Sequence, residues 1–413
     1  MDPGIAPKPR HALRRFPGVR PLLAGAVFVG LGLATSHTLK VGYADRLYHQ
    51  GSTPAVARAR RLLPGNAAFF RDDPRDQTAL AQAVAGNPRY SSGWIALGLL
   101  AEVERDFPRA ERLLLEAARV DNTYEPRWSL ANFYFRSRDQ EKFWIWARKA
   151  AEMAYHDQTP LFQLCWRNTQ DPAVILARAI PDRPLILAQY LNFLLLQGKV
   201  SEAEAVGGRL IVRATGEASP LLVSYCDRLI ADGRMASAVR AWNVLCERGL
   251  LPYQPLDPPQ GRSLTNGDFA VSPQSVAFDW RSRPPDGVTA VRTVSPAAFR
   301  LTFSGSQPER CQLLSQVLPV EPSRGYRLIY DFRTEGIPSP SGLRWYLSDL
   351  ASWKELSAAR LESSSGSWSR GELDFVAPAS DRGVLLVLEY QRAQGTTRIE
   401  GDLWLRQFSL VFR

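Results

Sequence analysis

The feature that most constrains this chain is a repeat of 33–35 residues within residues 41–250. Trp94 recurs as Trp128 after 34 residues, and Gly198 recurs as Gly233 after 35. A period of this length is typical of helix–turn–helix units that stack, because a single unit leaves an apolar face uncovered. The repeat therefore predicts an all-α solenoid over this half of the chain.

The sizes of the repeated residues match such a stack. Large residues of the first helix, such as Trp94 and Trp128, would pack against small residues of the second, such as Ala117 and Ala150. This pattern resembles the tetratricopeptide-repeat family, with an interruption at residues 156–183. The resemblance implies a scaffold that binds protein partners. A solenoid that serves only as a spacer is the alternative.

The composition changes abruptly near residue 250. Residues 251–262 contain four Pro and predict an extended linker. In residues 263–413, short runs such as residues 326–332 alternate apolar and polar side chains between turn clusters, which predicts an all-β antiparallel sandwich. Trp280 and Trp404 are predicted to pack in its core.

Three stretches of the C-terminal region together resemble the jelly-roll carbohydrate-binding modules. They are Asn266-Gly267-Asp268-Phe269, Gln316 to Pro322 followed by Tyr326, and Gly401-Asp402-Leu403-Trp404-Leu405. The resemblance implies a jelly-roll fold, a glycan ligand and a structural calcium ion. Ala270, Arg406 and Gln407 stand where the family commonly has acids, and a hard cation needs several oxygen ligands. We therefore expect no metal and no cofactor.

Sugar binding requires flat aromatic faces and a few polar side chains. The residues expected to bind a glycan are Trp353, Trp368, Tyr346 and Arg344. Trp353 and Trp368 lie in Ser- and Gly-containing stretches that are typical of loops or strand edges. Alternation along a strand places Trp345 and Tyr346 on opposite faces, so one of the two is expected in the core.

The N-terminus predicts a membrane anchor. Five Lys and Arg residues in residues 1–20 face one acid, and residues 21–39 carry no formal charge. A helix of that length spans roughly 28 Å, about the thickness of a hydrocarbon core. We therefore expect a cytoplasmic basic tail, a transmembrane helix over residues 21–40, and a single-pass inner-membrane protein with its bulk in the periplasm. A cleaved signal peptide is the alternative.

Several functional classes lack their motifs. The sequence contains no HExxH, GxSxG, GxxxxGK[ST] or strand-linked GxGxxG, so no catalytic residue is expected. The net charge of +10 is partly explained by the N-terminus, and no basic run interleaved with aromatics indicates nucleic-acid binding. The sequence therefore predicts a non-enzymatic adaptor that binds protein through the repeats and glycan through the sandwich, in export or assembly of bacterial envelope polysaccharide. The alternatives are a scaffold whose sandwich binds no sugar, and an enzyme with a site at the junction of repeats and sandwich.

Overall fold

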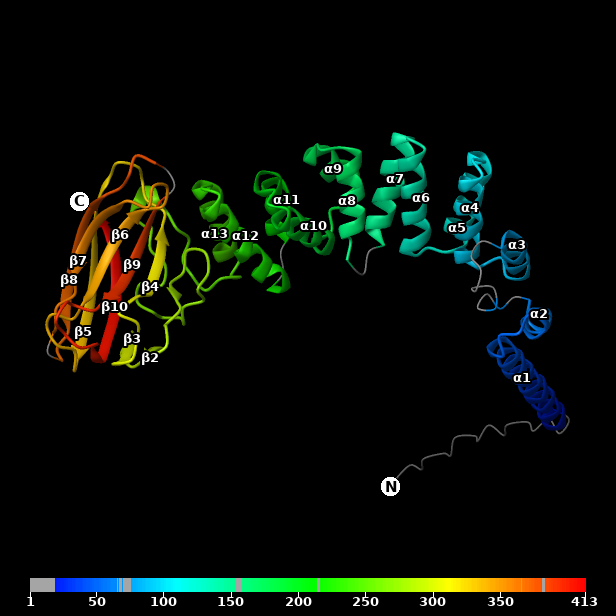
Figure 1. Ribbon diagram of the computed structural model, residues 1–413, viewed down its shortest axis with the longest axis horizontal. Helices are drawn as coiled ribbons and strands as arrows, with labels where there is room; N and C mark the ends of the chain where they lie inside the picture. Colours follow the sequence, from blue (N-terminus) through cyan, green and yellow to red (C-terminus); the bar gives the residue numbers. More distant parts are fainter. Residues whose placement is uncertain are drawn as a thin grey trace, which may run out of the picture. The chain divides into compact units, whose positions relative to one another are not determined.

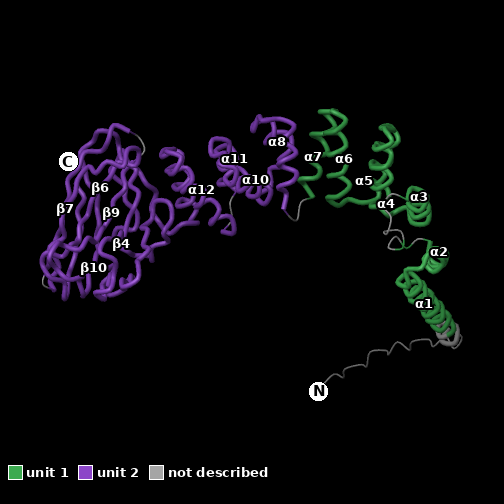
Figure 2. Tube along the Cα trace, viewed as in Figure 1, with its two compact units in different colours: residues 1–153 green, residues 154–413 purple. Residues whose placement is uncertain are grey.

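The computed structural model describes residues 19–64, 66, 69, 76–153, 157–213, 216–364, 366–380 and 383–413 (Figure 1). Residues 1–18 of the predicted basic tail, residues 1–20, lie outside the described residues. Helices occupy the N-terminal part of the chain and strands the C-terminal part. The chain divides into two compact units, residues 1–153 and residues 154–413 (Figure 2). The predicted order of a helical region followed by a two-sheet β-sandwich is confirmed.

The first unit contains the helices α1 to α7. Their bounds are α1 Val19–His49, α2 Thr53–Leu62, α3 Gln77–Gly86, α4 Ser91–Val103, α5 Phe107–Val120, α6 Tyr124–Arg136 and α7 Gln140–Glu152. Asp106 and Asp139 are the N-cap residues of α5 and α7. Each side chain stabilises the start of its helix by accepting a hydrogen bond from a backbone N–H of the first turn. Ala117 and Ala150 are fully buried, as expected for small residues at a close helix contact.

The second unit begins with the helices α8 to α13. Their bounds are α8 Thr159–Asn168, α9 Pro172–Arg178, α10 Pro184–Leu196, α11 Val200–Arg213, α12 Ser219–Ala231 and α13 Met235–Glu247. Gly198 and Gly233 lie at the α10–α11 and α12–α13 turns with φ of 69° and 77°. Glycine adopts this left-handed region without a steric penalty, so the glycines repeat where the turn repeats.

The sandwich consists of two five-stranded antiparallel sheets. Its strands are β1 Arg281–Ser282, β2 Val288–Val294, β3 Ala297–Ser304, β4 Arg310–Leu318, β5 Gly325–Glu335, β6 Leu343–Asp349, β7 Glu355–Arg360, β8 Ser369–Val376, β9 Val384–Gln391 and β10 Glu400–Phe412. One sheet has the order β1-β4-β9-β6-β7 and the other β2-β3-β10-β5-β8. The chain changes sheet at most connections between β3 and β10, which is the jelly-roll order.

Aromatic residues fill the space between the two sheets. Trp345 of β6 and Trp280 are fully buried, with ring centroids 6.2 Å apart. Phe408 lies 5.4 Å from Trp345 and 4.9 Å from Trp280, edge-on to both rings. Trp345 therefore faces the core, and its neighbours along β6 face outward.

The segment predicted as a linker, residues 251–262, packs between α13 and the sandwich. Tyr253 stacks on the fully buried Trp242 of α13 with ring centroids 5.5 Å apart. Trp242 also meets Phe278 of the sandwich edge-on at 5.7 Å. The Tyr253 hydroxyl donates a 2.9 Å hydrogen bond to Oδ2 of Asp279, a buried carboxyl whose pKa is raised by desolvation. The last helices of the repeat region and the sandwich thus share one packed interior.

The predicted membrane anchor at residues 21–40 is wrong. Helix α1 covers this stretch, but no helix within the described residues combines the length and the apolar character that crossing a membrane requires. Ser36, His37, Thr38 and Lys40 lower the mean hydropathy of its second half. The predicted inner-membrane location, with the bulk of the chain in the periplasm, is overturned by the same finding. The membrane as a partner has no support.

Candidate functional site

The candidate site is the outward surface of the sheet β1-β4-β9-β6-β7, which we call the β9 face. Alternation along β6 sends Trp345 inward and places Arg344 and Tyr346 on this face. The strand register sets Arg344 opposite Glu389 of β9 on one side and Arg360 of β7 on the other. Two of the four residues predicted to bind a glycan therefore lie two positions apart on one strand.

A shared glutamate fixes the centre of the β9 face. Glu389 is 5% exposed and accepts hydrogen bonds from Arg310 Nε at 2.6 Å and Arg344 Nε at 2.9 Å. Arg344 also pairs with Glu355 at 3.1 Å, and its guanidinium lies 5.0 Å from the centroid of the Tyr346 ring. Charge-assisted bonds of this kind hold planar groups in a defined orientation. Arg344 and Tyr346 thus form an ordered polar and aromatic platform.

The turn between β6 and β7 holds Trp353 in the solvent. The Trp353 backbone N–H donates to the Asp349 carbonyl at 2.8 Å, and φ of Trp353 is 57°. The Asp349 carboxylate accepts from Ser352 Oγ at 2.6 Å, from the Ala351 N–H at 3.0 Å and from Ser380 Oγ at 3.3 Å. Burial acts to raise the pKa of Asp349, but these hydrogen bonds outweigh it and lower the pKa. Trp353 is 68% exposed on this tightly bonded turn.

Trp353 lines a cavity of about 810 Å³, which we call the Trp353 pocket. The pocket brings together side chains from α12, β1, β4, β9 and the β6–β7 turn, among them Asp227, Arg228, Arg281, Arg283, Gln312, Ser315 and Leu385. Asp227 of α12 accepts hydrogen bonds from the Ala277 N–H at 2.9 Å and from Arg281 Nη2 at 2.7 Å. These bonds attach α12 to the sandwich, so a helix forms one wall of the pocket.

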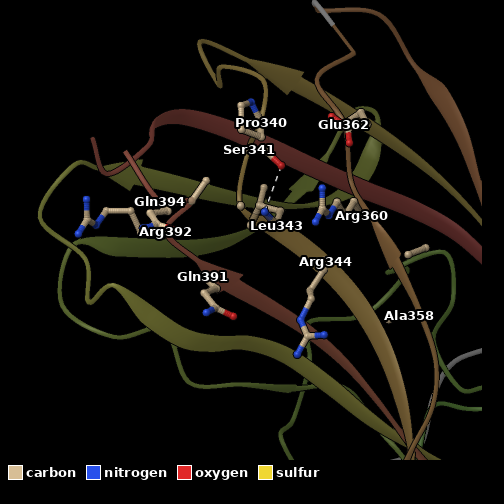
Figure 3. A pocket seen from close by; sticks show the side chains of 13 residues that line it. Pro340, Ser341, Leu343, Arg344, Ala358, Arg360, Glu362, Gln391, Arg392 and Gln394 are labelled. Atoms are coloured by element: carbon tan, nitrogen blue, oxygen red, sulfur yellow. Dashed lines mark hydrogen bonds between the residues drawn. The ribbon is translucent and has the colours of Figure 1, made fainter. Parts of the chain in front are cut away.

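A second cavity of about 600 Å³ lies toward the opposite end of β9 and β6, and we call it the Arg344 pocket (Figure 3). Arg344, Arg360 and Gln391 line it from three neighbouring strands, and Arg392 follows β9 at its edge. Ser341 Oγ accepts a hydrogen bond from the Leu343 N–H at 3.1 Å and so fixes the start of β6. Polar groups therefore continue along the β9 face between the two pockets.

Trp368 lies apart from the other three predicted residues. It packs on the outer surface of the other sheet, with the Arg406 guanidinium 3.8 Å from its ring centroid. On the same surface Trp404 lies under Arg333 at 4.0 Å and Arg300 at 5.3 Å. Trp404 is thus buried, but beneath arginines rather than between the sheets, because its neighbours along β10 occupy the core. The structure brings Trp353, Tyr346 and Arg344 to one face and leaves Trp368 on the other.

Arginine side chains occupy two of the three positions where the family resemblance implies calcium ligands: Arg292 bonds to Ala270, and Arg406, which faces Asp331, is itself the second. The Ala270 carbonyl accepts from Arg292 Nη2 at 2.5 Å, and Arg406 covers Trp368. A second cation there would meet like-charge repulsion. In the part of the chain that the structure describes, no group of three or more His, Cys, Asp or Glu side chains is placed to hold a metal ion.

Sequence reasoning missed several residues of the site. Arg310 and Glu389 become neighbours only through the pairing of β4 with β9, which are 79 residues apart at this pair. Asp227 lies in a helix about 50 residues before the strand it contacts. The Asp349-x-x-Ser352 pattern, which is typical of a turn stabilised by side-chain hydrogen bonds, was the one local signal for the rigid β6–β7 turn.

No protein-family model matches the chain, and the search of curated proteins found no match. Among solved structures, a CBM4 structure matches at 10% identity and a TM-score of 0.29, covering 37% of this chain and 100% of that one. TmCBM61, solved in complex with β-1,4-galactotriose, matches at 16% identity and a TM-score of 0.27, covering 37% and 98%. YrrB, a TPR protein with an unusual peptide-binding site, matches at 10% identity and a TM-score of 0.23, covering 48% and 93%. Likenesses at these TM-scores do not identify a ligand for this chain.

Proposed function

We propose that this protein is a non-enzymatic adaptor that binds a glycan on the β9 face and a protein partner through its helical repeats. The observation that carries the glycan proposal is Trp353, a large aromatic ring that is 68% exposed on a rigid turn. A core tryptophan would be buried, and a tryptophan exposed on a mobile loop would lose conformational entropy on binding. Trp353 is neither buried in the core nor carried on a mobile loop.

The surroundings of Trp353 fit a sugar. An indole face stacks on the apolar C–H face of a pyranose, while hydroxyls require hydrogen-bond partners nearby. Gln312 and Ser315 line the same pocket and provide donors and acceptors. Val387 of β9 is paired with Tyr346 on one side and Ser315 on the other, so the platform at Tyr346 continues into the Trp353 pocket. One oligosaccharide lying across β6, β9 and β4 would contact both aromatic rings.

The geometry of the acids supports a binding role over a glycosidase. A glycosidase requires two carboxylates that flank the scissile bond. On the β9 face, Glu389 is buried beneath Arg310 and Arg344, and Glu355 pairs with Arg344. Both carboxylates are therefore engaged by arginine side chains rather than placed to flank a scissile bond. Release of reducing sugar from a glycan that the protein binds would contradict the non-enzymatic proposal.

The proposal for a protein partner rests on a groove of about 270 Å³ among α11, α12 and α13. Gly207 keeps the helices close, because a Cβ there would lie 2.6 Å from the Tyr225 ring. Val212 lines the groove and is 65% exposed. A photo-crosslinking residue at position 212 should capture a defined protein, whereas the same residue at Leu196, which is 76% exposed outside the groove, should not. Equal crosslinking at both positions would favour a spacer role for the helices.

A glycan array with the full chain tests the sugar proposal. Binding that is lost in Trp353→Ala and kept in Trp368→Ala would support the β9 face. Absence of binding to every glycan would favour the scaffold whose sandwich binds no sugar. The predicted role in export or assembly of envelope polysaccharide was drawn from the pairing of helical repeats with the sandwich, and nothing in the described residues supports it.

A further inference from the structure

We infer that the ligand of the Trp353 pocket is an acidic sugar, with a uronate carboxylate held between Arg228 of α12 and Arg283 after β1. This inference rests on the proposed glycan-binding function and specifies its ligand class. It also assigns one wall of the glycan site to the helical repeats, since Arg228 lies on α12.

The charge around the pocket favours an anion. Its charged lining residues are Arg228, Arg281 and Arg283 against a single acid, Asp227. Asp227 is already engaged, because Arg281 Nη2 donates to its Oδ1 at 2.7 Å and the Ala277 N–H donates to the same atom. Two formal positive charges therefore remain uncompensated in the lining.

Among the residues that the structure describes, Arg228 and Arg283 have no counter-ion of their own. Both Arg228 and Arg283 are exposed, and neither forms an ion pair within the described part of the chain. Arg310 and Arg344 at the centre of the β9 face differ, since they share Glu389. Two unpaired guanidinium groups lining one concave site repel each other, and a bound carboxylate would relieve that repulsion.

The third element of the site selects a sugar over a simple anion. Trp353 presents a flat apolar face in the same pocket, and a pocket of about 810 Å³ lies within the range usual for organic ligands. A uronate carries both features that the lining offers to bind, because its ring has an apolar C–H face and its carboxylate is planar and matches a guanidinium fork. A neutral sugar would use Trp353 and leave the arginines unpaired.

Calorimetry with the full chain tests this inference. The probes are trimers of galacturonate and of mannuronate, each compared with its carboxyl-reduced neutral counterpart at low and at high salt. We expect at least one acidic trimer to bind about tenfold or more tightly than its neutral form, with a preference that weakens at high salt. Arg228→Gln and Arg283→Gln should each reduce affinity for the acidic trimer about three- to tenfold and leave affinity for the neutral form unchanged. Arg370→Gln is the control, since Arg370 is also exposed but lies on β8 of the other sheet, where it faces Asp331 at 3.8 Å.

Each result separates this inference from the proposed function. Equal or tighter binding of a neutral trimer, still dependent on Trp353, would overturn the acidic ligand and keep the glycan function. Binding of acidic trimers that is equally reduced by Arg370→Gln would show a nonspecific charge effect and overturn the site. Failure of every trimer and of the glycan array would overturn both proposals.

Discussion

Replacement of Trp353 by alanine gives the most direct test of the β9 face. A tryptophan side chain presents roughly 250 Å² of surface, and 68% of Trp353 is exposed. A sugar stacked on one face of the ring would cover about half of that exposed area, or about 85 Å². At about 25 cal/mol per Å², this burial contributes about 2 kcal/mol, which corresponds to an affinity loss of about 30-fold in Trp353→Ala.

The same substitution should leave the fold almost unaffected, because the ring contributes little to the core. We therefore expect a change of less than about 0.5 kcal/mol in the free energy of unfolding, measured by urea titration alongside calorimetry. Trp368→Ala is the matched control, since that ring packs under Arg406 on the opposite sheet. A glycan affinity that changes less than threefold in Trp353→Ala, with the control also unchanged, would refute the assignment of Trp353 as the stacking ring.

Three further substitutions test the framework around the site. In Asp349→Asn the free energy of unfolding should fall by about 1 kcal/mol at pH 7. The native pKa of Asp349 is lowered, so the stabilisation that its carboxylate provides is lost as pH falls through that pKa. The stability difference between Asp349→Asn and wild type should therefore shrink below about pH 4. Urea titrations at pH 7 and pH 3.5 would measure this change, and a difference that stays constant would contradict it. Tyr253→Phe removes the hydrogen bond to Asp279 and should lower the free energy of unfolding by about 1–2 kcal/mol, measured by urea titration. A decrease of less than about 0.3 kcal/mol would count against that hydrogen bond. Trp242→Ala should lower the free energy of unfolding by about 3–5 kcal/mol, because the ring is fully buried. Its effect on this free energy should not add to that of Tyr253→Phe, since the two rings are in contact. Strict additivity in the double variant would disprove that coupling.

The sequence predicted the elements of this fold more reliably than their contacts. The repeat of Gly198 at Gly233 marked two real turns, because local backbone conformation is encoded by the residue that adopts it. Alternation also placed Trp345 and Tyr346 on opposite faces of β6, since a strand has a period of two. Both features depend on neighbouring residues alone.

The candidate site depends on contacts between distant residues, which the sequence did not predict. No local pattern indicates that Arg228 of a repeat helix and Trp353 of a sandwich turn line the same pocket. Trp368 was predicted at a loop or strand edge, and it lies directly before β8 and is half-buried, but its contact with Arg406, 38 positions later, has no local signal in the sequence. The membrane anchor was predicted because residues 21–39 carry no formal charge. The polar residues of α1 nevertheless lower its mean hydropathy below what a membrane-spanning helix requires.

The attachment of α12 to the sandwich has a consequence for engineering with this protein. Asp227 ties the helix to Ala277 and Arg281, so the pocket is finished by residues that precede the sandwich in the chain. Grafting residues 263–413 onto an unrelated protein would transfer Trp353 but not Arg228, and would expose the Phe278 ring that Trp242 covers. The smallest portable unit for ligand recognition is therefore expected to begin before α12, and its specificity can be retuned by changing a helix without altering any strand.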